Sequence, residues 1–285
     1  SLDLKFSLMS DALPLGRKAL FHLPDGNTLM KWFCGSWTTA VFAFLYLPIF
    51  LLVLFSFNQS KSGFRWEGFT LQWYDALFRN QVLLHAFTNS LLIGTVSTLL
   101  ATALGTLGAW MLYRFRFPIH RTMEALIFVP MIMPEILMGV SLLVLFVNLS
   151  LPLSYLTVII AHVTFTFPFV LVGMQARLQG MDPSLEEAAM DLGATPRQAF
   201  FKVILPYLTP AIASGALLAF SLSLDDYIVT VFVTGAESQT LPLKVYGMVR
   251  VGLNPQLNAL SALGIVLTMI LVFASERLKQ SHPGE

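Results

Sequence analysis

The stretch Glu187-Ala188-Ala189-Met190-Asp191-Leu192-Gly193, closed by Pro206, is a short charged island between two long apolar runs. Just before it, Ser184-Leu185-Glu186-Glu187 has the spacing of a capping box, and Asp182-Pro183 suits the start of a helix. Gly193 is typical of the residue that ends a helix, because glycine adopts a left-handed conformation there without strain. The pattern predicts one short helix that ends at the turn around Gly193.

A second helix is predicted directly after that turn. Thr195 suits its N-cap, and Gln198 three residues later completes a second capping box. Pro206 is expected to break this helix where the next apolar segment begins. Two short helices joined by a tight turn form a rigid projection at a membrane face, which favours mechanical contact with a soluble partner.

The composition is that of a membrane protein. Hydrophobic residues make up 56% of the chain and charged residues only 12%, whereas a soluble domain has about 25% charged residues. A spanning helix needs about 20 apolar residues, so the uncharged run Ile136–Ala176 must hold two spans, with a break at Leu151-Pro152-Leu153-Ser154. We expect an all-α fold with about six spans, some of them kinked by prolines such as Pro134. The spans lie at approximately 36–57, 84–112, 124–149, 154–176, 207–233 and 254–274.

The distribution of Lys and Arg predicts the orientation of the chain. With six spans, both termini and the segment around Glu187 share one side of the membrane. That side collects twelve basic residues, which are Lys5, Arg17, Lys18, Lys31, Arg114, Arg116, Arg121, Arg177, Arg197, Lys202, Arg277 and Lys279. The opposite side collects five, which are Lys61, Arg65, Arg79, Lys244 and Arg250. By the positive-inside rule, the termini and the loop over 180–206 face the cytoplasm, which holds ATP.

The spacing of the charged segment resembles the EAA loop of the inner-membrane permease subunits of binding-protein-dependent ABC importers. That loop reads Glu-Ala-Ala, three residues, Gly, nine residues, an Ile-like residue, one residue and then Leu-Pro. The matching positions are Glu187, Ala188, Ala189, Gly193, Val203, Leu205 and Pro206. Val203 in the Ile-like position is the one departure, and it is conservative.

The resemblance covers approximately residues 36–275 and is to the spermidine/putrescine type of these permeases. It is carried by Leu185–Ala194, Leu222–Asp226, Phe232–Gly235, Leu241–Tyr246 and Gly252–Leu260. It implies the type I ABC importer permease fold in a bacterial inner membrane. The expected organisation is an N-terminal tail over 1–35, a transmembrane permease domain over 36–275 and a cytoplasmic C-terminal tail over 276–285.

The same resemblance implies the partners of the chain. A second homologous permease, two ATPase subunits and a periplasmic solute-binding protein would complete the transporter in the lipid bilayer. ATP and Mg²⁺ would be held by the ATPase, and this chain would bind no cofactor and no nucleic acid. The residues implied to dock on the ATPase are Glu187, Ala188, Ala189, Asp191, Gly193, Leu205 and Pro206.

Carboxylates inside the predicted spans are candidates for the solute pathway, because a charge in a bilayer is costly and usually faces the bundle interior. Glu135 follows Pro134 in the third span, and Asp225 and Asp226 precede Tyr227 in the fifth. Carboxylates flanked by aromatic rings suit an amine-bearing organic cation. The alternatives are that these acids lie near the membrane surface or cap a broken helix. Since adjacent helical residues point about 100° apart, we expect one aspartate to face the pathway and the other to meet a group of the chain.

Small residues mark two faces of the second span at four-residue spacing. One face carries Ser97, Ala101, Gly105 and Ala109, and the other carries Ser90, Gly94, Thr98, Thr102 and Thr106. Small residues allow helices to approach closely, so we expect helix packing here in preference to a pore lining. In the fourth span, His162 is expected to be a hydrogen-bonded structural residue.

The expected function is import of putrescine, spermidine or a similar organic cation. Permeases with a similar loop also carry iron or amino-acid-like solutes, and an ion-coupled secondary transporter using Glu135 or Asp225 is an alternative of another class. A purely structural scaffold would not need intramembrane carboxylates. The sequence contains no Gly-x-x-x-x-Gly-Lys-Ser/Thr, His-Glu-x-x-His or Gly-x-Ser-x-Gly motif. We therefore expect no enzymatic chemistry and no metal site in this chain.

Overall fold

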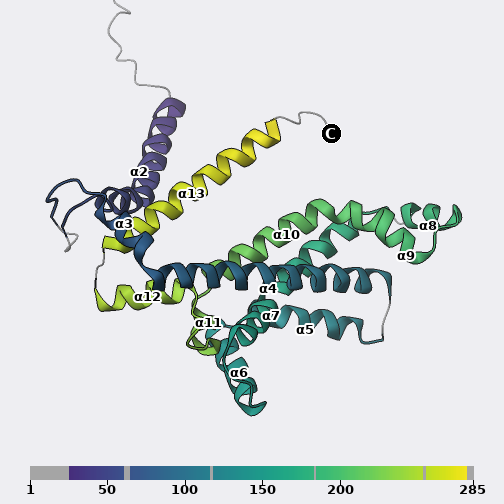
Figure 1. Cartoon of the computed structure of the whole chain (residues 1–285). Helices are drawn as coiled ribbons and strands as arrows, with labels where there is room; N and C mark the ends of the chain where they lie inside the picture. Colours follow the sequence, from purple (N-terminus) through teal and green to yellow (C-terminus); the bar gives the residue numbers. More distant parts are fainter. Residues whose placement is uncertain (1–25, 61–64, 116–117, 183, 253–254, 281–285) are drawn as a thin grey trace, which may run out of the picture. The chain divides into compact units, whose positions relative to one another are not determined.

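The structure is a computed structural model that describes residues 26–60, 65–115, 118–182, 184–252 and 255–280 (Figure 1). The chain divides into two units, residues 1–54 and 55–285. The first unit contains all but the last residue of helix α2 (Gly26–Phe55), which takes in most of the first expected span, 36–57, and begins within the expected tail. Its described side chains are exposed from residue 30 to residue 50. Of the two expected tails, residues 1–25 and 281–285 lie outside the described residues.

The second unit is built from helices. Among its described residues, an isolated antiparallel bridge between Asn58 and Phe69 is the one pairing of strand type. The helices are α3 (Gln72–Arg79), α4 (Gln81–Arg114), α5 (His120–Ile132), α6 (Glu135–Asn148), α7 (Tyr155–Gln179), α8 (Ser184–Asp191), α9 (Pro196–Ala199), a π-helical turn (Phe200–Ile204), α10 (Leu205–Asp225), α11 (Ile228–Val233), α12 (Leu241–Val251) and α13 (Pro255–Gln280).

The apolar helices agree with most of the expected spans. By length and composition, four helical stretches of the described chain could cross a membrane: Met30–Phe55, Gln81–Arg114, Tyr155–Gln179 and Pro196–Asp225. The bent pair α5 and α6 makes a fifth if it is counted as one span. The sixth expected span, 254–274, falls on α13, where the side chains at 267–268 and beyond 269 lie outside the described residues.

Helices α4, α7 and α10 pack side by side at the centre of the second unit (Figure 1). The small residues of α4 make this packing possible. A Cβ atom built on Gly105 would lie 2.8 Å from Cβ of Val170 in α7, and one built on Gly94 would lie 3.2 Å from the ring of Phe220 in α10. The two faces of small residues therefore pack against two different helices, and the expected packing role is confirmed at these positions.

The third expected span is broken, where a kinked helix was expected. The direction of the helix axis changes by 108° between α5 and α6. Met133, between them, has an extended backbone with ψ of 133°, because the ring of Pro134 disfavours the helical conformation of the preceding residue. Pro134 then stands as the N-cap of α6, so the chain changes direction at a proline that starts a helix.

The fifth expected span, 207–233, differs at both ends from the helix that the structure shows there. Pro206 does not break the second helix of the projection, because the helix runs on from Pro196 to Asp225. The amide of Leu205 bonds to the carbonyl of Phe200 in the π-helical turn. This interruption of the regular α-helical hydrogen bonding, directly before Pro206, accommodates a residue that has no N–H to donate within a continuous helix. The helix then ends at Asp225, and the apolar residues 228–233 form the separate helix α11.

Candidate functional site

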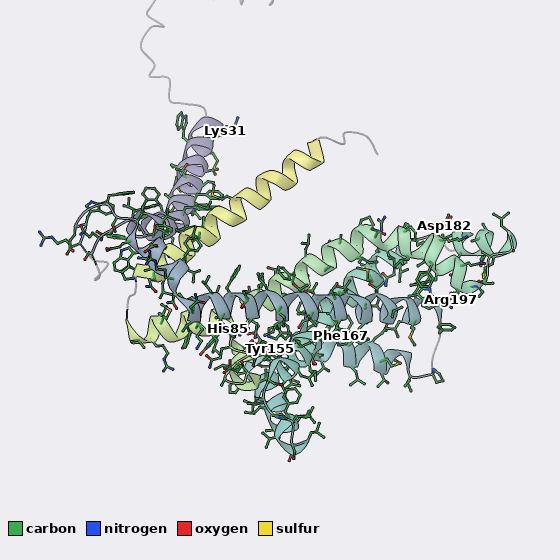
Figure 2. All side chains as sticks on the ribbon, viewed as in Figure 1. Lys31, His85, Tyr155, Phe167, Asp182 and Arg197 are labelled. Carbon is green, nitrogen blue, oxygen red and sulfur yellow. The ribbon has the colours of Figure 1, made fainter. Side chains whose placement is uncertain are left out.

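Helices α8 and α9 form the predicted projection at one end of the second unit, where Figure 2 labels Asp182 and Arg197. The capping residue of α8 is Asp182, whose Oδ1 accepts a hydrogen bond of 3.0 Å from the amide of Ser184. The amide and hydroxyl of Ser184 lower the pKa of the exposed Asp182 carboxyl. Ser184 is therefore the first helical residue and not the N-cap that a capping box would require. Pro183, expected at the helix start, lies outside the described residues.

The turn between the two helices has the predicted chemistry. Gly193 has a φ of +90°. Its amide bonds to the carbonyl of Met190, and the amide of Ala194 bonds to that of Ala189, which is the Schellman pattern. Thr195 and Gln198 exchange side-chain and backbone hydrogen bonds of 3.3 and 2.9 Å, so the second capping box is confirmed.

Helix α8 has two unlike faces. The predicted coupling residues Glu187, Ala188 and Asp191 are exposed, as is Gly193 in the turn, while Ala189 is half-buried. On the opposite face, Glu186 is only 6% exposed. A soluble partner could thus reach the outer face of α8 directly.

The remaining coupling residues lie apart from that face. Leu205 and Pro206 belong to the first turn of α10. Leu205 is half-buried and packs against the core cluster that contains Ile204 and Leu208, while Pro206 is exposed. The motif therefore combines an outward-facing surface on α8 with residues that start α10. The docking role of all these residues stays a prediction.

The base of the projection is a packed apolar cluster. Phe200, in the π-helical turn, lies with its ring centroid 4.6 Å from that of Trp110 in α4. The Arg177 guanidinium, near the end of α7, lies 4.3 Å from the ring centroid of Tyr207 in α10. The first contact joins the π-helical turn that follows α9 to α4, and the second joins α7 to α10 next to that turn.

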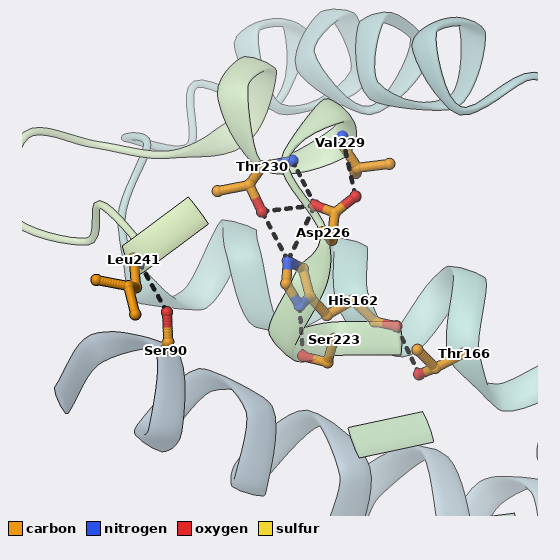
Figure 3. Close-up of polar contacts among 8 residues, drawn as sticks. All are labelled: Ser90, His162, Thr166, Ser223, Asp226, Val229, Thr230 and Leu241. Atoms are coloured by element: carbon orange, nitrogen blue, oxygen red, sulfur yellow. Dashed lines mark hydrogen bonds and ion pairs between the residues drawn. The ribbon is translucent and has the colours of Figure 1, made fainter. Parts of the chain in front are cut away.

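The break between α10 and α11 is organised by Asp226 (Figure 3). Its Oδ2 accepts hydrogen bonds from the amide and hydroxyl of Thr230, at 2.8 and 2.6 Å, and its Oδ1 accepts one from the amide of Val229 at 3.3 Å. Asp226 thus satisfies free amides in the first turn of α11 and lets the helix restart.

His162 of α7 completes this cluster (Figure 3). The imidazole is fully buried, with Nδ1 2.6 Å from Oγ of Ser223 and Nε2 2.9 Å from Oγ1 of Thr230. Nε2 also lies 3.5 Å from Oδ2 of Asp226. This arrangement confirms the structural role expected of His162. Because both oxygens of Asp226 are occupied within the chain, the geometry favours capping over solute contact for this residue.

The other candidate pathway residues are more accessible. Asp225 is exposed at the end of α10, and Glu135 is exposed in the first turn of α6, at the 108° break. The Tyr227 ring lies 4.2 Å from that of Tyr246 in α12, centroid to centroid. The structure places Asp225 and Glu135 each beside a helix break. Their contact with a solute stays a prediction.

A cavity that the sequence did not suggest lies at the end opposite the projection. It has a volume of about 990 Å³ and is lined by α11, α12 and their connection, including Thr234, Gln239 and Lys244. A neighbouring hollow of about 510 Å³ shares Gln239 and Lys244. Asn89 of α4 holds this connection by donating to the carbonyls of Glu237 and Gln239 at 2.8 and 3.0 Å. Sequence reasoning missed the cavity because its lining comes from separate elements and carries no fixed spacing.

Among the residues that the structure describes, no group of three His, Cys, Asp or Glu side chains is placed to hold a metal ion. The acids described above lie at helix ends, where they cap, pair or face outward.

The sequence and fold match those of known proteins. A family model described as "Binding-protein-dependent transport system inner membrane component" matches residues 101–280. The chain is 44% identical over 242 residues to the spermidine/putrescine transport system permease protein PotC of Escherichia coli K12, covering 85% of this chain and 92% of that protein. It is 44% identical over 229 residues to the putrescine transport system permease protein PotI of the same organism, covering 78% and 82%.

Solved structures share the fold at low sequence identity. A chain of a bacterial ABC transporter involved in import of the polysaccharide alginate superposes with a TM-score of 0.69 at 17% identity, covering 91% of this chain and 98% of that chain. A chain of the MetNI methionine ABC transporter gives a TM-score of 0.59 at 21% identity, covering 70% and 95%.

Proposed function

Since the chain belongs to the family of inner-membrane components of binding-protein-dependent transport systems, we propose that it is the permease subunit through which an ATP-driven importer moves a polyamine. The observation that carries the proposal is the 44% identity to two permeases named for spermidine and putrescine, over most of both chains. The expected family and importer-permease fold are confirmed by the same matches and by the alginate transporter fold.

The accessible carboxylates support an organic cation as the cargo. Asp225 and Glu135 are exposed where two of the apolar stretches are interrupted. The aromatic pair of Tyr227 and Tyr246 follows Asp225 at the start of the next helical region. A diamine or triamine would find ion-pairing groups and aromatic faces here, whereas an anionic solute would be repelled.

The outer face of α8 supports coupling to an ATPase. Glu187, Ala188 and Asp191 are exposed on a short helix whose two ends are both fixed by hydrogen bonds. The complete transporter would contain two ATPase subunits, a second homologous permease and a periplasmic solute-binding protein. Exposed apolar side chains along α2 would face lipid or the second permease.

The basic residues and the fold support one orientation of the chain in the membrane. Arg114, at the end of α4, contacts Glu186 of α8, so Arg114 lies at the same end of the unit as the loop that carries Arg197. With twelve basic residues against five, this end and both termini would lie in the cytoplasm. The cavity near Lys244 would then face the periplasm.

An uptake assay on the reconstituted transporter tests the function. The purified complex would be placed in liposomes with ATP on the ATPase side and radiolabelled putrescine or spermidine with the binding protein on the other. We expect uptake that requires ATP and stops with vanadate. Uptake driven by an ion gradient without ATP would replace this proposal by a secondary transporter, and ATP-dependent uptake of iron or an amino acid in place of polyamines would replace the cargo.

A further inference from the structure

Helix α8 has a buried charged contact on the face turned away from solvent. Glu186 is 6% exposed, and its Oε1 lies 3.2 Å from Nε of Arg114, the last residue of α4. The Arg114 side chain is 39% exposed. The contact joins the projection to the end of the longest helix of the second unit.

The positions of the two residues favour this ion pair. Arg114 lies in the last turn of α4, where the free carbonyls carry partial negative charge, and Glu186 lies in the first turn of α8, where the free amides carry partial positive charge. Glu186 Oε1 accepts no aligned hydrogen bond from the described residues. The guanidinium of Arg114 therefore compensates a carboxylate that would otherwise be buried without a partner.

Helix α4 extends from this contact to the cavity at the other end of the unit. Near its start, Asn89 donates hydrogen bonds to the carbonyls of Glu237 and Gln239. Ser90 accepts one from the amide of Leu241, at the start of α12. A displacement of α4 would thus move the connection that lines the 990 Å³ cavity.

We propose that the Arg114–Glu186 ion pair couples the movement of α8 to that of α4. The two residues act as positioning residues, since neither needs to touch the ATPase or the solute. This proposal rests on the coupling role proposed for the exposed face of α8. It assigns to the buried Glu186 a function different from that of the exposed Glu187 beside it.

The test measures how many polyamine molecules enter per ATP hydrolysed by the complete complex in liposomes. We expect Glu186→Gln and Arg114→Gln each to lower this ratio by about tenfold or more, while the ATPase still co-purifies with the permease. The reversed pair, Arg114→Glu with Glu186→Arg, should recover most of the loss, because the two charges still attract each other. Recovery will be incomplete, since each reversed charge opposes the dipole of its helix end.

A matched control is the exposed ion pair of Asp75 and Arg79 in α3, whose nitrogen and oxygen atoms lie 3.0 Å apart. Asp75→Asn with Arg79→Gln removes a pair of the same chemistry and should leave the ratio unchanged, because exposed pairs contribute little. If Glu186→Gln fails to accumulate, Arg114→Lys keeps the charge with altered geometry and should give an intermediate ratio.

Several outcomes would overturn the proposal that this ion pair couples α8 to α4. A wild-type ratio in both single variants would do so, as would a reversed pair no better than the single variants. Loss of the ATPase from the Glu186→Gln complex would also overturn it, in favour of a direct docking role. The proposed docking of α8 fails separately, if Glu187→Arg retains the ATPase and normal uptake.

Discussion

The adjacent acids Asp225 and Asp226 are expected to respond in opposite ways to the same substitution. Asp226→Ala removes the acceptor of two backbone amides and of the Thr230 hydroxyl. Loss of a helix cap costs about 1 kcal/mol, and loss of a hydrogen bond to a charged acceptor costs about 1.5–3 kcal/mol. The free energy of unfolding should therefore fall by about 3 kcal/mol, with further loss because His162 is left without its carboxylate neighbour.

Thermal unfolding of the detergent-purified subunit measures this cost. A loss of about 3 kcal/mol corresponds to a decrease in Tm of about 6–12 °C by the relation that holds for domains of about 150–250 residues. Asp225→Ala is the matched control, because its carboxylate is exposed one residue earlier. Its Tm should stay within about 2 °C of the wild type, as substitutions at exposed positions change stability by about 0.5 kcal/mol or less.

The uptake assay measures the role predicted for Asp225. Asp225→Ala should reduce polyamine uptake by about tenfold, the equivalent of about 1.4 kcal/mol of lost cation binding, although the protein stays as stable as the wild type. An unchanged Tm for Asp226→Ala, or a larger decrease for Asp225→Ala than for Asp226→Ala, would refute the division of roles read from the structure.

Three further substitutions test other parts of the molecule. Gly105→Leu should lower the free energy of unfolding by about 1–3 kcal/mol in the same thermal assay, because its Cβ would lie 2.8 Å from Val170; Gly173→Leu, with open space around its Cβ, is the control and should be near neutral. Glu187→Arg should leave the Tm unchanged but abolish co-purification of the ATPase, and a complex of normal composition would contradict docking on α8. Glu135→Gln should reduce polyamine uptake severalfold in an assembled complex, whereas unchanged kinetics would assign Glu135 to the start of α6 alone.

Much of the fold was predictable because it depends on local chemistry. The length of the apolar runs gave the helices that cross the membrane, and Gly193 with Thr195 and Gln198 gave the turn and the second cap. Pro206 was misjudged because the effect of a proline depends on the hydrogen bonds before it. A π-helical turn, which no residue pattern indicates, directly precedes Pro206 and accommodates its missing N–H within the continuous helix.

The candidate site was predictable only in part, since adjacent residues with the same charge have different surroundings. Glu186 and Glu187 point about 100° apart on one helix. The buried one, Glu186, pairs with Arg114, which lies far from it in the sequence. In the same way, His162 and Thr230 contact Asp226 and not the adjacent Asp225. The sequence therefore identifies such residues as candidates, but their tertiary contacts determine which role each one has.

The uninterrupted helix from Pro196 to Asp225 has a mechanical consequence. Its 30 residues form a rod about 45 Å long, with the turn proposed to dock on the ATPase at one tip and the acidic pair at the other. A tilt of about 5° at the first tip would sweep the second by about 4 Å, comparable to the width of an alkyl chain. Under the proposed function, a small movement of the ATPase at the first tip would therefore be enough to open or close the solute pathway beside the second.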